Sequence, residues 1–332
     1  ALAHRDPRAL QSVRDETVGE LGFWHFVQWR FHVQWQRLRE EAHSRGIHIV
    51  GDVPIFVAHQ SADVWAHADQ FLLDAQGLPD VVAGVPPDYF SATGQRWGNP
   101  LYRWDRMALD DYRWWKQRMA HLLTLVDVAR LDHFRGFEAN WEIPANEPTA
   151  QGGHWSPGPG RAFFQSIREE LGTLPIIAED LGIITEDVTR LRRACGFPGM
   201  RVMQFAFGDN ARNPYLPHNF GRCTVAYTGT HDNNTTVGWW ANASENERQA
   251  ARQYLGQVTD SEIHWAMIQS LSQSVANTLV VPFQDVLGLD GQHRMNTPGQ
   301  PKGCWSWRFA WADVGDEPAR RLSSMVRAHG RA

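Results

Sequence analysis

Helical and strand-like hydrophobic patterns alternate along most of the chain. Residues 20–45 carry apolar and aromatic side chains at helical spacing and end in a charged run followed by Gly46, a common helix stop. The next stretch, IHIVGDVPIFVA (47–58), is a short apolar run of the kind found in buried strands. A helix followed by a buried strand is typical of parallel α/β folds.

This alternation recurs, and we count six buried-strand candidates in total. Further helical patterns cover 112–124, 161–172, 186–196 and 245–276. The other strand candidates are LVDVARLDHF (125–134), LPIIAEDLG (174–182), GMRVMQFAFG (199–208), CTVAYTGTHDNN (223–234) and NTLVVPFQDVLGL (277–289). A doubly wound sheet is an alternative, but no glycine-rich nucleotide fingerprint supports it. A (β/α)₈ TIM barrel with helical and loop insertions is favoured, because polar strand ends then converge on one axis.

A closed barrel needs eight strands, so the first two strands are expected to be missing from this chain. Residues 1–332 would then be the C-terminal two-thirds of one catalytic barrel. Residues 58–111, with GVPPDYFSATGQRWGNPLYRW, are predicted to be an inserted lid or subdomain after the third strand. Residues 134–160 are predicted to be an inserted loop after the fourth strand. Structureless loops of this length are usually lids or binding loops.

Composition narrows the range of partners. The net charge of −5 comes from scattered charges, so neither a nucleic acid nor a membrane is expected as partner. The 3 cysteines form no C-x-x-C pair and are expected to be reduced, buried thiols of a cytoplasmic protein. Several of the 16 tryptophans lie in Gly/Pro/Asn-rich stretches, where a flat ring can stack on a sugar.

Acidic residues stand where the strand candidates end. Each alone is more simply explained as a helix cap or a surface loop residue, but their recurrence at one end of successive strands favours a shared site. Carboxylates that face one axis repel one another, which raises the pKa of at least one. The acids are Asp52, Asp132, Glu179 with Asp180, Asp232 beside His231, and Asp285.

Retaining glycoside chemistry uses an ionised carboxylate and a protonated carboxyl group about 5 to 5.5 Å apart. Alternate residues of a strand share a face, so Arg130 favours the ionised form of Asp132, the predicted nucleophile. Glu179 has no adjacent cation and is the predicted proton donor and later general base. Asp232 and His231 are predicted to stabilise the oxocarbenium-like transition state and to hold sugar hydroxyls.

Two other classes of protein fit parts of this pattern. A metal-dependent barrel hydrolase would need histidine pairs at ligand spacing, and the strand candidates contain no H-x-H, so this alternative is not favoured, although the strands expected to be missing could contain such a pair. A carbohydrate-binding barrel that has lost its catalytic activity would need only the fold. The presence of the three acids Asp132, Glu179 and Asp232 favours an enzyme.

Seven segments resemble the amylomaltases or disproportionating enzymes, which are 4-α-glucanotransferases of glycoside hydrolase family 77 in the α-amylase clan. In chain order they are GDVPIFVA, GVPPDYFSATGQRWGNPLYRW, RLDHFRGF, IAEDLG, MQFAF, YTGTHDNNTT and RMNTPG. The resemblance implies transfer of an α-1,4-glucan segment to the 4-hydroxyl of glucose or another glucan, in starch, glycogen or maltodextrin metabolism. It implies glucans and malto-oligosaccharides as partners, and no metal or organic cofactor.

The resemblance also implies roles for individual residues. Asp132 would be the nucleophile, Glu179 the acid/base and Asp232 the transition-state stabiliser. The residues expected to bind substrate are Arg130, His133, His231, Asp52 and Asp180, together with Asp88, Tyr89, Phe90, Gln95 and Trp97 of the loop that arches over the cleft in this family. An α-glucan hydrolase of the same clan and a catalytically silent glucan-binding fragment stay open as alternatives.

Overall fold

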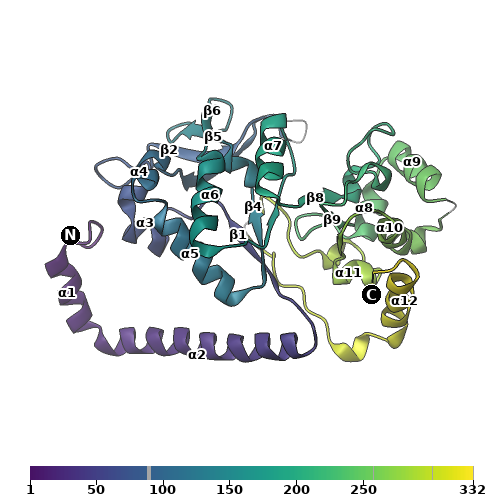
Figure 1. Ribbon diagram of the computed structural model, residues 1–332, viewed down its shortest axis with the longest axis horizontal. Helices are drawn as coiled ribbons and strands as arrows, with labels where there is room; N and C mark the ends of the chain where they lie inside the picture. The colour runs from purple at the N-terminus through teal and green to yellow at the C-terminus, as the bar shows by residue number, and fades with distance from the viewer. Residues whose placement is uncertain (88–90, 257, 301, 332) are drawn as a thin grey trace. The chain divides into compact units, whose positions relative to one another are not determined.

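The apolar runs predicted to be buried strands all contain a strand in the computed structural model, which describes residues 1–87, 91–256, 258–300 and 302–331. The chain divides into two units, Ala1–Phe197 and Pro198–Ala332, and each is described by itself (Figure 1). In both units helices lead into parallel strands, so the predicted α/β class is confirmed.

The parallel strands of the first unit are β1 (Val50–Pro54), β4 (Val128–Asp132) and β7 (Ile176–Ala178), side by side in that order. Asp52 of β1 is in register with Arg130 of β4. Among the described strands β1 has a neighbour on one side only, which makes it an edge strand. Edge strands present unpaired N–H and C=O groups.

Three helices accompany these strands: α5 (Arg113–Leu125), α6 (Gly160–Leu171) and α7 (Glu186–Cys195). The first two lead into β4 and β7, as the alternation of patterns predicts, and they lie next to each other in Figure 1. Helix α7 begins at the N-cap Thr185, whose hydroxyl accepts a hydrogen bond from the N–H of Val188. It ends at Gly196, whose φ of 73° suits a helix stop.

Aromatic side chains make up much of the core of the first unit. Trp115 of α5, Phe163 and Phe164 of α6, and Phe134 and Phe137 after β4 are fully buried. The rings of Trp115 and Phe163 meet edge to face with centroids 5.4 Å apart. Burying each such side chain stabilises the fold by about 1.5–3 kcal/mol. Part of the high tryptophan content therefore serves packing.

The two insertions form one antiparallel sheet. Its strands are β2 (Val81–Val85), β3 (Gln95–Pro100), β5 (Ala139–Pro144) and β6 (His154–Pro157), in the order β3-β2-β5-β6. These insertions are not structureless, because 58–111 and 134–160 pair with each other through β2 and β5. Gly84 allows this pairing, since a Cβ there would clash with the carbonyl oxygen of Gln95 and with Ile143.

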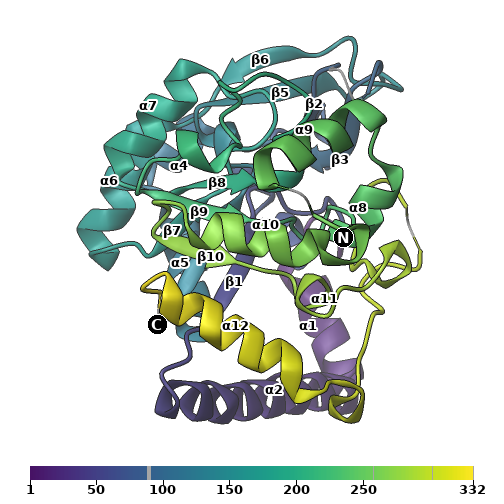
Figure 2. The same cartoon turned by 90° about the vertical axis from the view of Figure 1, so that its right-hand side faces the viewer.

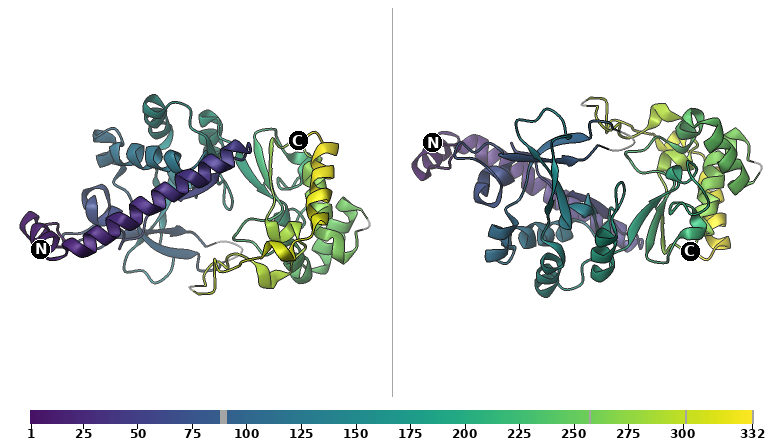
Figure 3. Two further views of the ribbon diagram at one scale, coloured as in Figure 1. Left: turned by 90° about the horizontal axis from the view of Figure 1, so that it is seen from below. Right: turned by 90° about the horizontal axis from the view of Figure 1, so that it is seen from above.

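Four more helices belong to the first unit: α1 (Pro7–Glu16), α2 (Val18–Ser44), α3 (Ala62–Ala66) and α4 (Trp104–Leu109). Helix α2 has no buried residue and is seen as one long straight helix in Figure 3. It is anchored where Trp35 Nε1 donates to the carbonyl oxygen of Leu125 at 2.8 Å and Arg39 Nη2 donates to Asp127 at 2.6 Å. Among the described helices, none combines the length and apolar character that a membrane span requires.

The second unit contains β8 (Gly199–Val202), β9 (Thr224–Tyr227) and β10 (Thr278–Val280), parallel and in that order. Its helices are α8 (Thr236–Asn242), α9 (Glu245–Leu255), α10 (Ile263–Ser272), α11 (Phe283–Val286) and α12 (Asp316–Ala328). Helix α12 packs against α10, as Figure 2 shows.

Two expectations for the second unit need correction. The helical pattern over 245–276 is broken, because α9 ends at Gly256, whose φ of 88° is unfavourable for other residues. Of the three cysteines expected to be buried, Cys195 is buried, whereas Cys223 of the second unit is exposed and Cys304 is partly exposed.

Candidate active site

One guanidinium group holds two carboxylates at the carboxyl end of β4. Arg130 Nη1 lies 2.7 Å from Asp52 Oδ2 and 2.9 Å from Asp132 Oδ1. The register places Asp52 opposite Arg130, and Arg130 and Asp132 share a face because they alternate along β4. The Arg130 side chain is 10% exposed, and those of Asp52 and Asp132 are 43% and 41% exposed. The cation is therefore buried beneath two accessible carboxylates.

Glu179 follows β7 directly, beside Asp132. The last paired residues of β4 and β7 are Leu131 and Ala178, and the N–H of Glu179 continues the ladder by donating to the carbonyl oxygen of Leu131 at 3.0 Å. Neighbouring strands lie about 4.8 Å apart. The two carboxyl groups therefore extend from adjacent strand ends at one edge of the sheet.

Main-chain amides hold both oxygens of the Glu179 side chain. The N–H of His133 donates to Oε2 at 2.7 Å, and the N–H of Leu181 donates to Oε1 at 2.9 Å. Burial and the neighbouring charge of Asp132 raise the pKa of Glu179 to about 7, although Arg130 and the two amides act in the opposite direction. Glu179 thus carries a proton up to near neutral pH, as a general acid requires.

His133 turns the chain immediately after β4. Its φ of 54° and ψ of 49° are left-handed. Its ring meets Trp97 edge to face with centroids 4.7 Å apart, and Phe56 lies 6.2 Å away. Burial, with a smaller effect of Arg135, lowers the pKa of His133 to about 3, so the ring is neutral at physiological pH. Its Nε2 is buried without a hydrogen-bond partner in the described part of the chain.

A cavity of about 490 Å³ opens beside Asp132 and His133. Its other walls are the segment after β1, including Phe56, and the side chains of Trp97 and Asn99 from β3. Apolar rings beside a few polar groups are typical of small-molecule sites. A volume of this size, with Asp132 in its wall, can hold a sugar unit against the carboxylate.

The structure describes part of the predicted substrate loop. Trp97 is 38% exposed, and its Nε1 donates to Oε1 of Gln95 at 3.1 Å. Both residues belong to β3. The other residues predicted for this loop, Asp88, Tyr89 and Phe90, lie outside the described residues.

Asp180 is buried and forms an ion pair with an arginine of α7. Its residue is 3% exposed, and its Oδ2 lies 3.0 Å from Nε of Arg192 on α7. Arg192 Nη1 also donates to the carbonyl oxygen of Phe197 at 2.8 Å. This position favours a structural role for Asp180, which joins the segment after β7 to α7.

His231 and Asp232 belong to the second unit and follow β9. His231 Nε2 lies 3.3 Å from Asp232 Oδ2, and Nδ2 of Asn296 donates to Asp232 Oδ1 at 2.6 Å. Arg294 donates to the carbonyl oxygen of Asp232 at 2.9 Å. Sequence reasoning assigned no role to Asn296 or Arg294. Both residues belong to the motif RMNTPG, and this motif was the sequence feature that could have pointed to them.

Asp285 is buried in the second unit and acts as an anchor. It accepts hydrogen bonds from the hydroxyls of Thr228 and Thr236 at 2.6 and 2.7 Å and from the N–H of Thr236 at 2.7 Å. Burial raises its pKa, although these bonds oppose the change. Asp285 therefore ties the start of α8 to the residue after β9.

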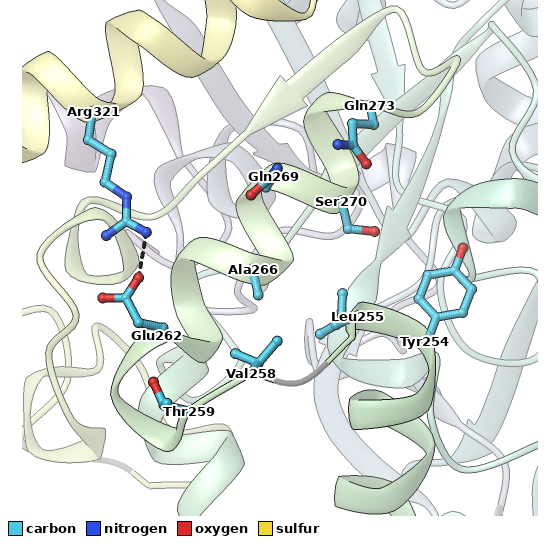
Figure 4. A pocket seen from close by; sticks show the side chains of 10 residues that line it. All are labelled: Tyr254, Leu255, Val258, Thr259, Glu262, Ala266, Gln269, Ser270, Gln273 and Arg321. Carbon is cyan, nitrogen blue, oxygen red and sulfur yellow. Dashed lines mark hydrogen bonds and ion pairs between the residues drawn. The ribbon is translucent and has the colours of Figure 1, made fainter.

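A second cavity of about 480 Å³ lies among α9, α10 and α12 (Figure 4). Glu262 and Arg321 form an ion pair in its wall, and Gln269 and Tyr254 also line it. No predicted site residue lines this cavity within the described part of the chain.

One group outside the site has metal-ligand atoms within 4.8 Å of one another: His43, His48 and Asp127. The Asp127 carboxylate already accepts hydrogen bonds from Arg39 at 2.6 Å and from the N–H of Ile49 at 2.7 Å. Burial alone would raise the pKa of Asp127, but these bonds and His43 outweigh it and lower the pKa well below its usual range. This cluster fastens α2 to the start of β4.

Residues 1–313 match a protein family described as 4-alpha-glucanotransferase. The 4-alpha-glucanotransferase of Thermus thermophilus is 49% identical over 338 residues, covering 99% of this chain and 67% of that protein. The chloroplastic/amyloplastic 4-alpha-glucanotransferase of Arabidopsis thaliana is 44% identical over 333 residues, covering 99% of this chain and 58% of that protein. The chain thus spans about two thirds of the first relative and less of the second.

Solved structures give the same similarity. The amylomaltase of Streptococcus agalactiae in complex with acarbose has a TM-score of 0.97 and 37% identity, covering 100% of this chain and 67% of that chain. The amylomaltase of Corynebacterium glutamicum has a TM-score of 0.77 at 19% identity, covering 96% of this chain and 51% of that chain, which is a similarity of fold alone.

Proposed function

The chain belongs to the 4-alpha-glucanotransferase family, and from that premise we propose that it carries the catalytic groups of an enzyme that moves α-1,4-glucan segments. The donor is an α-1,4-glucan or malto-oligosaccharide, and the acceptor is the 4-hydroxyl of glucose or of another glucan. The observation that carries the proposal is the pair of carboxyl groups on adjacent strand ends, Asp132 against Arg130 and Glu179 with a pKa near 7.

The reaction is a retaining double displacement. In the first step a carboxylate oxygen of Asp132 bonds to the anomeric carbon of the donor while the glycosidic bond breaks. Glu179 gives its proton to the departing oxygen, and the shortened glucan leaves. In the second step Glu179, now ionised, accepts the proton of the incoming 4-hydroxyl. That oxygen then bonds to the anomeric carbon and releases Asp132.

The environments of the two carboxyl groups support these different roles. Arg130 lies 2.9 Å from Asp132 and favours its ionised form, which the nucleophile needs. Glu179 is more buried and faces the charge of Asp132, which favours its protonated form. Asp232 is proposed as the stabiliser of the oxocarbenium-like transition state, with His231 on sugar hydroxyls, and this part of the proposal rests on family membership.

Substrate binding is proposed for the polar groups near the cavity and for the loop that carries Trp97. Asp52, Arg130 and His133 surround Asp132, and Trp97 and Gln95 extend from β3. We propose that Trp97 stacks on the acceptor sugar, which excludes water and orients the attacking hydroxyl. Asp88, Tyr89 and Phe90 are proposed as parts of the same loop, and Asp180 is proposed to support the site through its ion pair with Arg192.

We also propose that the chain is the C-terminal part of a (β/α)₈ barrel whose first two strands are supplied by further polypeptide. Three observations support this. The chain spans 67% and 58% of two relatives. In addition, β1 has one open side among the described strands, and α2 exposes aromatic side chains that a neighbouring element would cover.

Incubation with maltotriose tests the activity. A transferase yields glucose together with a ladder of longer chains, whereas an α-glucan hydrolase of the same clan yields shorter sugars only. Asp132→Asn should abolish the ladder while malto-oligosaccharide binding persists. The matched control is Asp105→Asn, an exposed acid on α4 that should leave the ladder unchanged. If Asp132→Asn changes nothing, the silent glucan binder is the better reading.

A further inference from the structure

We propose that the left-handed backbone at His133 is a positioning device for Glu179, which it serves through the main-chain N–H and not through the imidazole ring. This inference rests on the proposed function insofar as Glu179 is the group that transfers the proton. The geometry that supports it, namely a strand end, a turn and two amide donors, holds whatever the substrate is.

The end of β4 and the segment after it contact Glu179 at several points. The main-chain N–H of Glu179 donates to the carbonyl oxygen of Leu131 at 3.0 Å, and its carbonyl oxygen accepts from the N–H of Phe134 at 3.1 Å. The N–H of His133 donates to Oε2 of the Glu179 side chain at 2.7 Å. The turn at His133 directs the N–H of His133 at the Glu179 side chain. The main-chain contacts of Glu179 with Leu131 and Phe134 lie on either side of this bond.

A left-handed conformation costs free energy at any residue with a Cβ, and histidine is among the residues that adopt it more often than average. Packing of the ring compensates here. Trp97 lies edge to face at 4.7 Å, and Phe56 lies at 6.2 Å. Gly136 leaves room for the ring, because a Cβ there would lie 3.2 Å from His133 Cδ2 and 2.9 Å from Ile55 Cδ1.

The ring itself adds no charge to the site. It is buried and stays neutral over the range in which the reaction would be measured. In the described part of the chain the charged groups that act on Glu179 are Asp132 and Arg130, both from β4. The effect of residue 133 on the Glu179 proton therefore passes through the amide.

Two amide donors also fix the direction of the proton. Each carboxyl oxygen has two lone-pair sites, and on Glu179 one site of Oε1 faces Leu181 and one site of Oε2 faces His133. The proton must occupy a remaining site, which turns it away from the main chain. A fixed direction of this kind is what proton transfer to a glycosidic oxygen needs.

The first test is an NMR titration of the full polypeptide without sugar. The amide proton of residue 133 should shift with an inflection at the same pH as the Glu179 carboxyl carbon, and Glu179→Gln should remove this inflection. An amide shift that stays flat while Glu179 titrates would overturn the proposal. The titration needs no turnover, so its outcome is independent of whether the maltotriose ladder forms.

The second test separates the backbone from the ring. His133→Gly and His133→Asn keep access to positive φ, so the residue 133 inflection should persist. His133→Val opposes positive φ, and it should lose the inflection and raise the Glu179 pKa by about one unit, as expected for a lost charge-assisted hydrogen bond. Equal Glu179 pKa values in the Val and Gly variants would contradict the proposal. If the Val variant does not fold, Gly136→Ala is measured in its place: its Cβ would displace the ring that holds the turn, so the residue 133 inflection should weaken, and an unchanged inflection with an unchanged Glu179 pKa would contradict the proposal.

Discussion

Asp132 and Glu179 follow directly on Leu131 and Ala178, a register pair of the neighbouring parallel strands β4 and β7. Adjacent strands lie about 4.8 Å apart, and retaining glycosidases hold their two carboxyl groups about 5 to 5.5 Å apart. Two carboxyl groups on adjacent strand ends therefore start from a separation that suits a covalent intermediate. An inverting mechanism needs about 6.5 to 9.5 Å, so that a water molecule fits between them.

The protonation of Glu179 predicts the pH dependence of the reaction. Its pKa is raised to about 7, so the proton needed for the first step is present below that pH and is lost as the pH rises through 7. We expect kcat/KM for maltotriose to fall above about pH 7. An α-glucosyl fluoride donor needs little protonation of its leaving group. The rate of its first step should therefore fall much less above pH 7. Identical pH profiles for both donors would contradict the assignment.

Arg130 is predicted to adjust both carboxyl groups. Its charge lowers the pKa of Glu179, so Arg130→Met should move the basic limb of the pH–rate profile upward. The variant also leaves Asp52 and Asp132 facing each other without a cation. Because both are partly exposed, we expect a loss of about 1–2 kcal/mol in unfolding free energy, below the range for fully buried pairs. Urea denaturation measures this loss.

Arg103→Met is the matched control for Arg130→Met, because Arg103 is exposed. It should change neither the pH–rate profile nor the denaturation midpoint. Arg130→Lys keeps the charge but loses the guanidinium group, whose Nη1 contacts both carboxylates. In the Lys variant the pKa of Glu179 should therefore lie closer to its wild-type value than it does in the Met variant. If the basic limb of the pH–rate profile of the Met variant is the same as in the wild type, the predicted electrostatic effect of Arg130 on Glu179 is wrong.

Trp97 is predicted to set the balance between transfer and hydrolysis. Trp97→Ala opens the cavity beside Asp132 to water, so the ratio of chain lengthening to free glucose release should fall severalfold. Trp155→Ala is the matched control, since Trp155 is also 38% exposed but packs on Trp141 and Arg135 outside the cavity. Chromatography of the maltotriose products gives the ratio. An unchanged ratio in the Trp97 variant would refute the predicted water exclusion.

The aromatic face of α2 predicts the behaviour of the isolated chain. Phe23, Phe26 and Trp29 follow one another at three-residue spacing on α2 and are 57%, 56% and 55% exposed, which leaves an apolar patch along one side of the helix, of a kind that marks an interface. We expect the isolated chain to self-associate in sedimentation experiments. Changing these three residues to Gln should reduce association, and so should adding the polypeptide proposed to complete the barrel. A wild-type chain that stays monomeric at high concentration would oppose the proposed covering of α2.

Local patterns were sufficient to predict the parallel strands. Each of the six apolar runs contains a strand, and Arg130 and Asp132 share a face because period-2 alternation fixes it. The antiparallel sheet was missed, because β2 pairs with β5, which is far away in sequence, and because β3, β5 and β6 are rich in Gly, Pro and polar residues. The break after α9 was missed because one glycine, Gly256, outweighs the helical pattern on either side.

Main-chain contacts explain most of what sequence reasoning could not find at the site. The residues Asp132 and Glu179 can be chosen from strand ends, but the amides of His133 and Leu181 that hold Glu179 depend on a left-handed turn. Residue type does not reveal which amide points at which carboxyl group. Likewise, the contact of Asn296 with Asp232 joins segments that no local pattern connects.

Trapping the covalent intermediate tests the central claim most directly. Glu179→Gln lacks the general base, so with α-glucosyl fluoride it should form the glycosyl-enzyme and then release it slowly. Mass spectrometry of the digested protein should find one added glucosyl group, on the peptide that contains Asp132, and Asp132→Asn in the same background should remove it. A glucosyl group on another residue, or no adduct while the fluoride is consumed, would contradict the account.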